Sequence, residues 1–153
     1  LVGESRDRET LRSMLEAAEI GVAAYSTVHT RSVADTLARI INVFPIDEQP
    51  GITTTLIASI RTIVQQRLVA RHNEPGRVAL REYLVFGERE RRELWDTPPE
   101  RLGLAMRDRM AALAQGVGVG QDLLTATRRA FDVGEIGPET LHAIERERAI
   151  APK

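Results

Sequence analysis

Short apolar runs alternate with amphipathic segments over the first half of the chain, and this alternation constrains the fold more than any other feature. Leu1-Val2 runs into Gly3-Glu4, and a second apolar run over residues 22–29 ends in polar residues. Between them, residues 8–20 carry apolar side chains at helical spacing. Such alternation is typical of a parallel α/β sheet. We therefore expect a strand end at residues 1–3 and a strand buried on both faces at 22–29.

The second half of the chain predicts a hairpin followed by helices. Two β-rich runs, residues 63–71 and 77–86, are joined by a short turn that contains Pro75-Gly76. This pattern favours an antiparallel hairpin, which would continue the same sheet. Capping residues, prolines and apolar spacing predict the remaining elements. A capped helix should run from Ser32 to before Pro45, followed by a turn at Pro50-Gly51. Further helices are expected over about 53–60, 88–96 and 100–114, and a helix–turn–helix over 121–148.

Lysine is nearly absent, and this excludes one kind of nucleotide site within the chain. Of the 21 basic residues only Lys153 is a lysine. A P-loop needs a lysine beside its glycine-rich turn to reach the β- and γ-phosphates. The glycine-rich run at Gly116–Gly120 has no such lysine, and we expect it to be a flexible link between helices.

Two polar side chains stand where the predicted strands end. Glu4 follows the first strand, and His29 lies at the end of the second. Ligands of open α/β sheets bind outside the carboxyl ends of the strands. A carboxylate there can hold magnesium, directly or through water, and a histidine can contact a phosphate or sense its loss. The plainer alternatives stay open: Glu4 as an acid that favours a helix dipole, and His29 as an ordinary packed or surface residue.

Composition narrows the class of protein. The chain has 153 residues, 42% of them hydrophobic, which fits one domain with a real core. The formal net charge of −1 provides no basic field for nucleic acid. Cysteine is absent, so disulfides and thiolate metal sites are excluded. No apolar run approaches the roughly 20 residues that span a bilayer, and the expected compartment is the cytoplasm.

Four stretches, in order along the chain, resemble the secretion and pilus-motor ATPases. "LVGESRDRETL" resembles their Walker B region, and "AAYSTVHTRSVADTLARIINVFP" resembles their histidine box with its following helix. "VQQRLVAR" is similar to their Gln-Arg-Leu strand, and "GQDLLTATRRAFDVGEIGPETLHAI" to their C-terminal helical hairpin. The resemblance is greatest to the type IVB secretion and conjugation branch, the DotB/TraJ-like ATPases. The charged link over residues 88–100 departs from the more apolar motif of the pilus-retraction members, which puts any partner surface copied from that branch in doubt.

The resemblance implies a fold class and a division of the chain. It implies an α/β fold that is the C-terminal half of a RecA-like P-loop ATPase core with a small C-terminal helical layer. Residues 1–87 would form the partial core from the Walker B strand onward, and residues 88–153 the C-terminal helical region. The P-loop, the acidic Asp box and the N-terminal domain of the family are then expected upstream.

The resemblance also implies a function and a set of site residues. It implies ATP and Mg²⁺ as cofactors, and a homohexamer that powers a secretion or conjugation apparatus without binding nucleic acid directly. Such a protein would be cytoplasmic and peripherally associated with the inner membrane. By position, Glu4 matches the Walker B glutamate, which would serve in catalysis and hold magnesium, His29 matches the catalytic histidine, and Arg6 would help bind the nucleotide. From a different class, a non-catalytic interaction module that keeps the fold without a P-loop remains the alternative.

Overall fold

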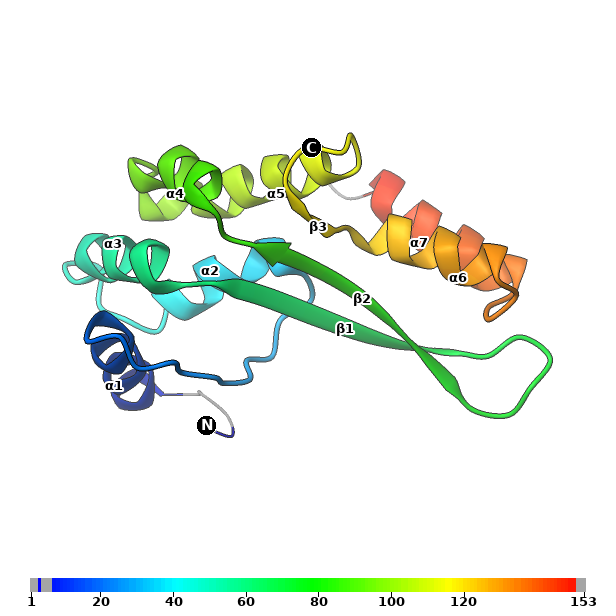
Figure 1. Cartoon of the computed structure of the whole chain (residues 1–153), viewed down its shortest axis with the longest axis horizontal. Coiled ribbons are helices and arrows are strands. Elements are labelled where there is room, and N and C mark those ends of the chain that lie inside the picture. The colour runs from blue at the N-terminus through cyan, green and yellow to red at the C-terminus, as the bar shows by residue number, and fades with distance from the viewer. Residues whose placement is uncertain (1–2, 4–6, 151–153) are drawn as a thin grey trace.

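The chain forms two groups of helices on a long antiparallel hairpin (Figure 1). The computed structural model describes Gly3 and residues 7–150, with side chains as far as residue 148. In chain order the elements are α1 Arg8–Glu19, α2 Val33–Ile41, α3 Gln49–Ser59, β1 Thr62–Ala70, β2 Arg77–Val85, α4 Glu88–Trp95, the 3₁₀ turn η1 Pro99–Arg101, α5 Leu102–Leu113, β3 Val119–Gln121, α6 Leu123–Asp132 and α7 Pro138–Ile150.

The hairpin agrees with the sequence-based prediction. β1 and β2 pair antiparallel over nine residues each, from Thr62 opposite Val85 to Ala70 opposite Arg77. Residues on one face of β2 alternate with residues on the other, and the buried face carries positions 78, 80, 82 and 84. The short strand β3 pairs antiparallel with β2 and gives the sheet order β1-β2-β3. The described sheet is therefore entirely antiparallel.

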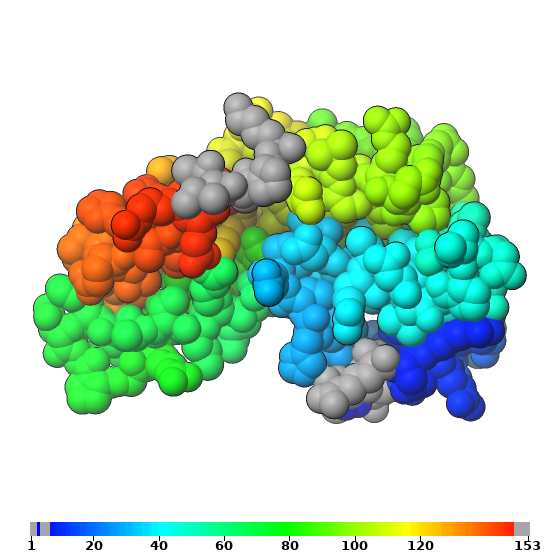
Figure 2. Space-filling model, turned by 180° about the vertical axis from the view of Figure 1, so that it is seen from behind, coloured from blue at the N-terminus to red at the C-terminus, as the bar shows by residue number. Residues whose placement is uncertain are grey.

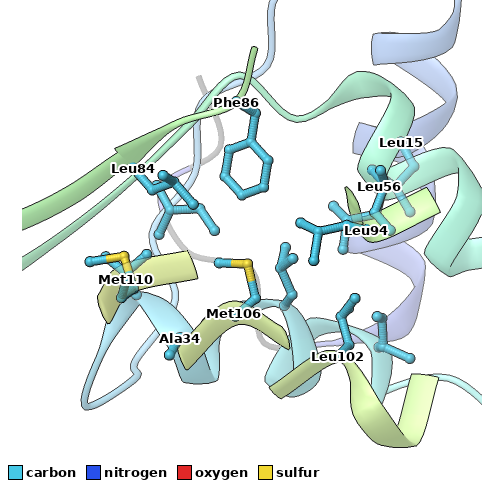
Figure 3. Packing of buried hydrophobic residues seen from close by; sticks show 14 of the residues in the cluster. Leu15, Ala34, Leu56, Leu84, Phe86, Leu94, Leu102, Met106 and Met110 are labelled. Atoms are coloured by element: carbon cyan, nitrogen blue, oxygen red, sulfur yellow. The ribbon is translucent and has the colours of Figure 1, made fainter. Parts of the chain in front are cut away.

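Two separate apolar clusters pack on the hairpin. The larger one lies under its open end and joins residues of α1 to α5 with Leu84 and Phe86 (Figure 3). The smaller one lies further along the hairpin, between β2 and the pair α6–α7, and contains Val78, Leu80 and Ile144. Because both clusters use the same face of β2, this strand connects the two groups of helices.

The helix boundaries follow local capping rules. Asp7 caps α1, and Ser32 caps α2 by accepting a hydrogen bond from the backbone N–H of Asp35 at 3.1 Å, as the sequence predicts. Gly21 ends α1 with φ of +87°, and the N–H of Val22 reaches back to the carbonyl of Ala17 at 2.9 Å. The predicted helices at 88–96, 100–114 and 121–148 are confirmed as α4, α5 and the pair α6–α7.

The prediction of a buried strand at residues 22–29 is wrong. The described structure has no strand there; residues 22–30 run as an irregular segment, and Tyr25 is 67% exposed. A strand needs a neighbour to pair its backbone groups with, and none of the three described strands lies beside this segment in the sheet. The apolar, β-branched composition signals a preference for extended backbone, which is not sufficient to make a strand.

Two further expectations are corrected. The third helix begins at Gln49, not near Thr53, because Pro50 lies in its first turn, where the missing N–H of proline has no helical partner to lose. The glycine-rich run is not a flexible link throughout: Val119 and Gly120 belong to β3, opposite Val85 and Leu84. At Gly120 a β-carbon would lie 2.4 Å from the carbonyl oxygen of Tyr83, so only glycine fits this close approach.

Candidate functional site

The segment that contains His29 lies against the start of the chain. Thr27 donates a hydrogen bond from its Oγ1 to the carbonyl oxygen of Gly3 at 2.6 Å. Gly3 directly precedes Glu4, and Thr27 precedes His29 by two residues. The two motifs that the sequence analysis placed at neighbouring strand ends therefore approach each other. Glu4 and Arg6 lie outside the described residues, so their side chains are not placed.

His29 is exposed at the end of an extended segment whose two ends are fixed. The Gly21 cap holds the start of the segment to α1. At the other end, the hydroxyls of Thr30 and Thr36 share a hydrogen bond of 3.0 Å, and Thr36 also donates to the carbonyl of Ser32 at 3.0 Å. Thr36 is buried on α2, so the residue after His29 is anchored to a packed helix.

A buried glutamate supports the start of this helix from the hairpin. Glu82 of β2 is 7% exposed, and its Oε1 accepts a hydrogen bond from the backbone N–H of Val33 at 2.5 Å. Burial raises the pKa of Glu82 above its ordinary value, and the negative charge of Asp122 adds to this effect. The backbone N–H of Val33 and the charge of Arg148 oppose it, because they favour the ionised form. Figure 2 shows the light-blue start of α2 in the middle of the molecule, between the N-terminal helices and the hairpin with α6 and α7.

The start of α1 follows Glu4 and Arg6 closely in the sequence and is fixed by a side-chain cap. Asp7 accepts hydrogen bonds from the backbone N–H and the hydroxyl of Thr10 at 2.8 and 2.9 Å, and these bonds lower the pKa of Asp7. Glu9 adds a negative charge to the first turn, where the helix dipole favours it. Asp7 and Glu9, in the charged run that follows Glu4, therefore serve to start α1.

Sequence reasoning missed Glu82 and the Thr30–Thr36 contact. The alternation of β2 contains the signal for Glu82, because Leu80, Glu82 and Leu84 occupy one face and the two leucines are buried. A charged residue at an inward position of a strand is uncommon unless it has partners. Its hydrogen-bond partner Val33 comes from α2, whose position no local pattern specifies.

Metal-binding and membrane-spanning features are absent from the part of the chain that the structure describes. Within residues 7–150, no three His, Cys, Asp or Glu side chains gather as a metal site would require. Among the same residues, no helix has the length and apolar character needed to cross a membrane. The magnesium site predicted at Glu4 falls outside these residues.

Comparison with known proteins identifies what this arrangement resembles. Residues 1–136 match the family model described as type II/IV secretion system protein. The chain is 41% identical over 85 residues to a protein named "Twitching motility protein" from Neisseria gonorrhoeae; the match covers 56% of this chain and 23% of that protein. The chain therefore spans only a minor part of the length of such relatives.

Solved structures agree with this match over nearly the whole chain. The X-ray structure of the Legionella pneumophila ATPase DotB superposes with a TM-score of 0.84 and 35% identity, covering 95% of this chain and 38% of that one. The crystal structure of the pilus retraction motor PilT with bound ADP gives a TM-score of 0.70 at 27% identity, covering 90% and 37%. These matches confirm both the resemblance drawn from the four motifs and the predicted α/β fold class.

Proposed function

The chain belongs to the type II/IV secretion system protein family, and on this premise we propose that it is the C-terminal part of a motor ATPase that drives secretion or conjugative transfer. The observation that carries the proposal is the hydrogen bond between Thr27 and Gly3. It brings the segment of His29 to Gly3, the residue before Glu4, in a chain similar to a motor structure that contains ADP.

The proposed roles follow from the chemistry of each side chain. Glu4 is the Walker B glutamate, whose charge holds magnesium, directly or through water, and positions the attacking water. His29 senses the phosphate or an adjacent subunit, which its exposed position on an anchored segment allows. Arg6 contributes a positive charge near the nucleotide.

The chain supplies only part of an ATP site. The glutamate and the histidine suit the magnesium and phosphate side, but Lys153 is the only lysine and stands at the last position. The P-loop amides and lysine that grip the phosphates would come from an upstream segment. In this proposal residues 1–87 complete a RecA-like core and residues 88–153 form its C-terminal helical region. ATP bound with Mg²⁺ would supply the phosphoryl group whose cleavage drives the motor.

The finer features of the family belong to the same proposal. We propose a homohexamer, a cytoplasmic position at the inner membrane, and docking to components of a secretion or conjugation apparatus without direct nucleic-acid binding. The similarity to DotB supports the secretion branch. The charged composition of α4 supports a docking surface different from that of the pilus-retraction motors.

The test is a Glu4→Gln variant of the full-length protein that contains this chain. The change is nearly isosteric, so the fold and ATP binding should persist. Hydrolysis should fall by about 10²–10³-fold, because an amide cannot provide the charge that positions magnesium and its waters. ATP turnover and thermal melting are measured on the same preparation. Near-normal turnover with a slightly lower melting temperature would instead make Glu4 a helix-start charge, and a wild-type protein that does not hydrolyse ATP would favour the non-catalytic module.

A further inference from the structure

Glu82 occupies the junction between the two groups of helices. Leu80 on one side of it belongs to the cluster under α6 and α7, and Leu84 on the other side belongs to the cluster under α2 and α5. All three side chains share one face of β2. A carboxylate in this position takes the place of an apolar residue that would join the two clusters, and its burial costs free energy unless the group is well partnered. A role in positioning other parts of the chain would offset this cost.

Glu82 accepts a hydrogen bond from the first amide of α2 and lies near the start of α6. Val33, the first residue of α2, donates its N–H to Oε1 at 2.5 Å. The N–H of Leu123, the first residue of α6, also stabilises the charge of Glu82. The third amides are satisfied locally, by Ser32 in α2 and by Asp122 in α6. The carboxylate thus gives the first amide of α2 a partner that a helix start otherwise lacks, and it brings a negative charge near the start of α6.

The contacts continue from Glu82 in both directions. Toward the N-terminus, the start of α2 holds Thr36, whose hydroxyl holds Thr30, the residue after His29. Toward the C-terminus, Asp122 forms an ion pair with Arg148 of α7 while it caps α6 through the N–H of Thr125. Hydrogen bonds therefore connect Glu82 with the residue after His29, and on the other side an ion pair joins α6 to α7. The two sides meet at β2, where Glu82 follows Leu80, which packs under α6 and α7.

We propose that Glu82 is a positioning residue for His29, through which the C-terminal helix pair α6–α7 sets the position of the histidine segment. The inference rests on the proposed ATPase function for its kinetic consequence. Its structural part, the coupling between α6–α7 and residues 26–34, does not need that function. Movement of α6–α7 against a partner would then change the site without contacting the nucleotide.

The test uses Glu82→Gln in the full-length protein. The Glu82 carboxylate accepts from the first amide of α2 and carries a negative charge near the start of α6, whereas the glutamine amide is neutral and accepts with one oxygen only. Both helix starts therefore lose a nearby negative charge that the helix dipole favours. We expect kcat to fall by about 10-fold or more, because small displacements of a catalytic group are costly, while the KM for ATP stays near the wild-type value.

Glu147→Gln is the matched control. Glu147 lies on α7 and pairs with Arg67 of β1 at 2.6 Å on the surface, so its removal deletes a carboxylate from the same region without affecting the junction. Hydrogen–deuterium exchange of the nucleotide-free proteins provides the structural measurement. Residues 26–34 should exchange faster in Glu82→Gln and at the wild-type rate in Glu147→Gln. Arg148→Ala, which loosens α6 from the far side, should also accelerate exchange in residues 26–34, and it serves if Glu82→Gln does not fold.

The outcomes distinguish the structural coupling of α6–α7 to residues 26–34 from the kinetic role of Glu82. Unchanged exchange at residues 26–34 in both Glu82→Gln and Arg148→Ala would overturn the coupling. Faster exchange with unchanged kcat in an active enzyme would overturn the positioning role. A wild-type protein without ATPase activity would refute the proposed function, and the exchange measurement would still decide whether Glu82 couples the two regions.

Discussion

Adding a single methyl group at Gly120 should detach β3 from the sheet. In Gly120→Ala the new β-carbon would lie 2.4 Å from the carbonyl oxygen of Tyr83 and 2.8 Å from Cδ1 of Leu113. Ordinary contact begins near 3.4 Å, so the backbone of β3 must move by about 1 Å from that of β2. The leucine can rotate away, but the Tyr83 carbonyl belongs to the central strand and cannot.

The expected cost combines overpacking with lost pairing. Forcing atoms into a packed site typically costs about 1–3 kcal/mol. Gly120 pairs with Leu84, and each ladder hydrogen bond lost there adds about 0.5–1.5 kcal/mol. We therefore expect the free energy of unfolding to fall by about 2–4 kcal/mol. Urea denaturation followed by far-ultraviolet circular dichroism measures it.

Gly103→Ala provides the matched control for this substitution. Gly103 lies in the first turn of α5, and a β-carbon there meets nothing within 4 Å. Alanine favours the helix by up to about 1 kcal/mol over glycine, so this variant should be at least as stable as the wild type. Equal unfolding midpoints for Gly120→Ala and the wild type would refute the close approach of β3 to β2.

Three further predictions concern binding and stability. The isolated chain should not bind ATP in isothermal titration calorimetry, because it has no P-loop lysine; micromolar affinity would contradict this. Arg91→Ala should lower the free energy of unfolding by about 2 kcal/mol in urea titrations, because the Arg91 guanidinium donates to the carbonyls of residues 57, 58, 60 and 86. Its exposed neighbour Arg92 should tolerate alanine, and equal losses for the two variants would contradict the prediction. Because burial raises the pKa of Glu82, the folded state binds its proton more tightly than the unfolded state does. The free energy of unfolding of the wild type should therefore fall as pH rises from the ordinary glutamate pKa through the raised one. Glu82→Gln should remove this fall, and identical pH profiles for the two proteins would contradict the prediction.

The sequence predicts the helices well because their signals are local. Asp35 lies three residues after Ser32, and the structure confirms Ser32 as the N-cap, because its hydroxyl accepts from the backbone N–H of Asp35. The Asp35 carboxylate accepts from the Ser32 hydroxyl and not from the Ser32 backbone N–H, so the second half of the predicted capping box is not formed. Gly21 follows the last apolar turn of α1 and adopts the positive φ expected of a helix end. The hairpin is equally local, because a short turn joins its two strands.

The failures concern features that depend on distant residues. The run 22–29 has the composition of a strand, but pairing needs a neighbour that composition cannot specify. Gly120 belongs to a glycine-rich run typical of a link, and its close approach to Tyr83 requires the position of β2. Glu82 could have been recognised as a charged residue at an inward position, whereas its hydrogen-bond partner Val33 lies 49 residues away in the sequence.

The most direct test of the account is the turnover of a His29→Ala variant of the full-length protein. His29 is the proposed site residue that the structure describes, on a segment held to Gly3 by Thr27. ATP hydrolysis is measured at saturating ATP together with the dissociation constant of the nucleotide. We predict slower turnover with nearly normal binding, because in its proposed role His29 would sense the phosphate without gripping the nucleotide. Unchanged turnover, or complete loss of nucleotide binding, would contradict it.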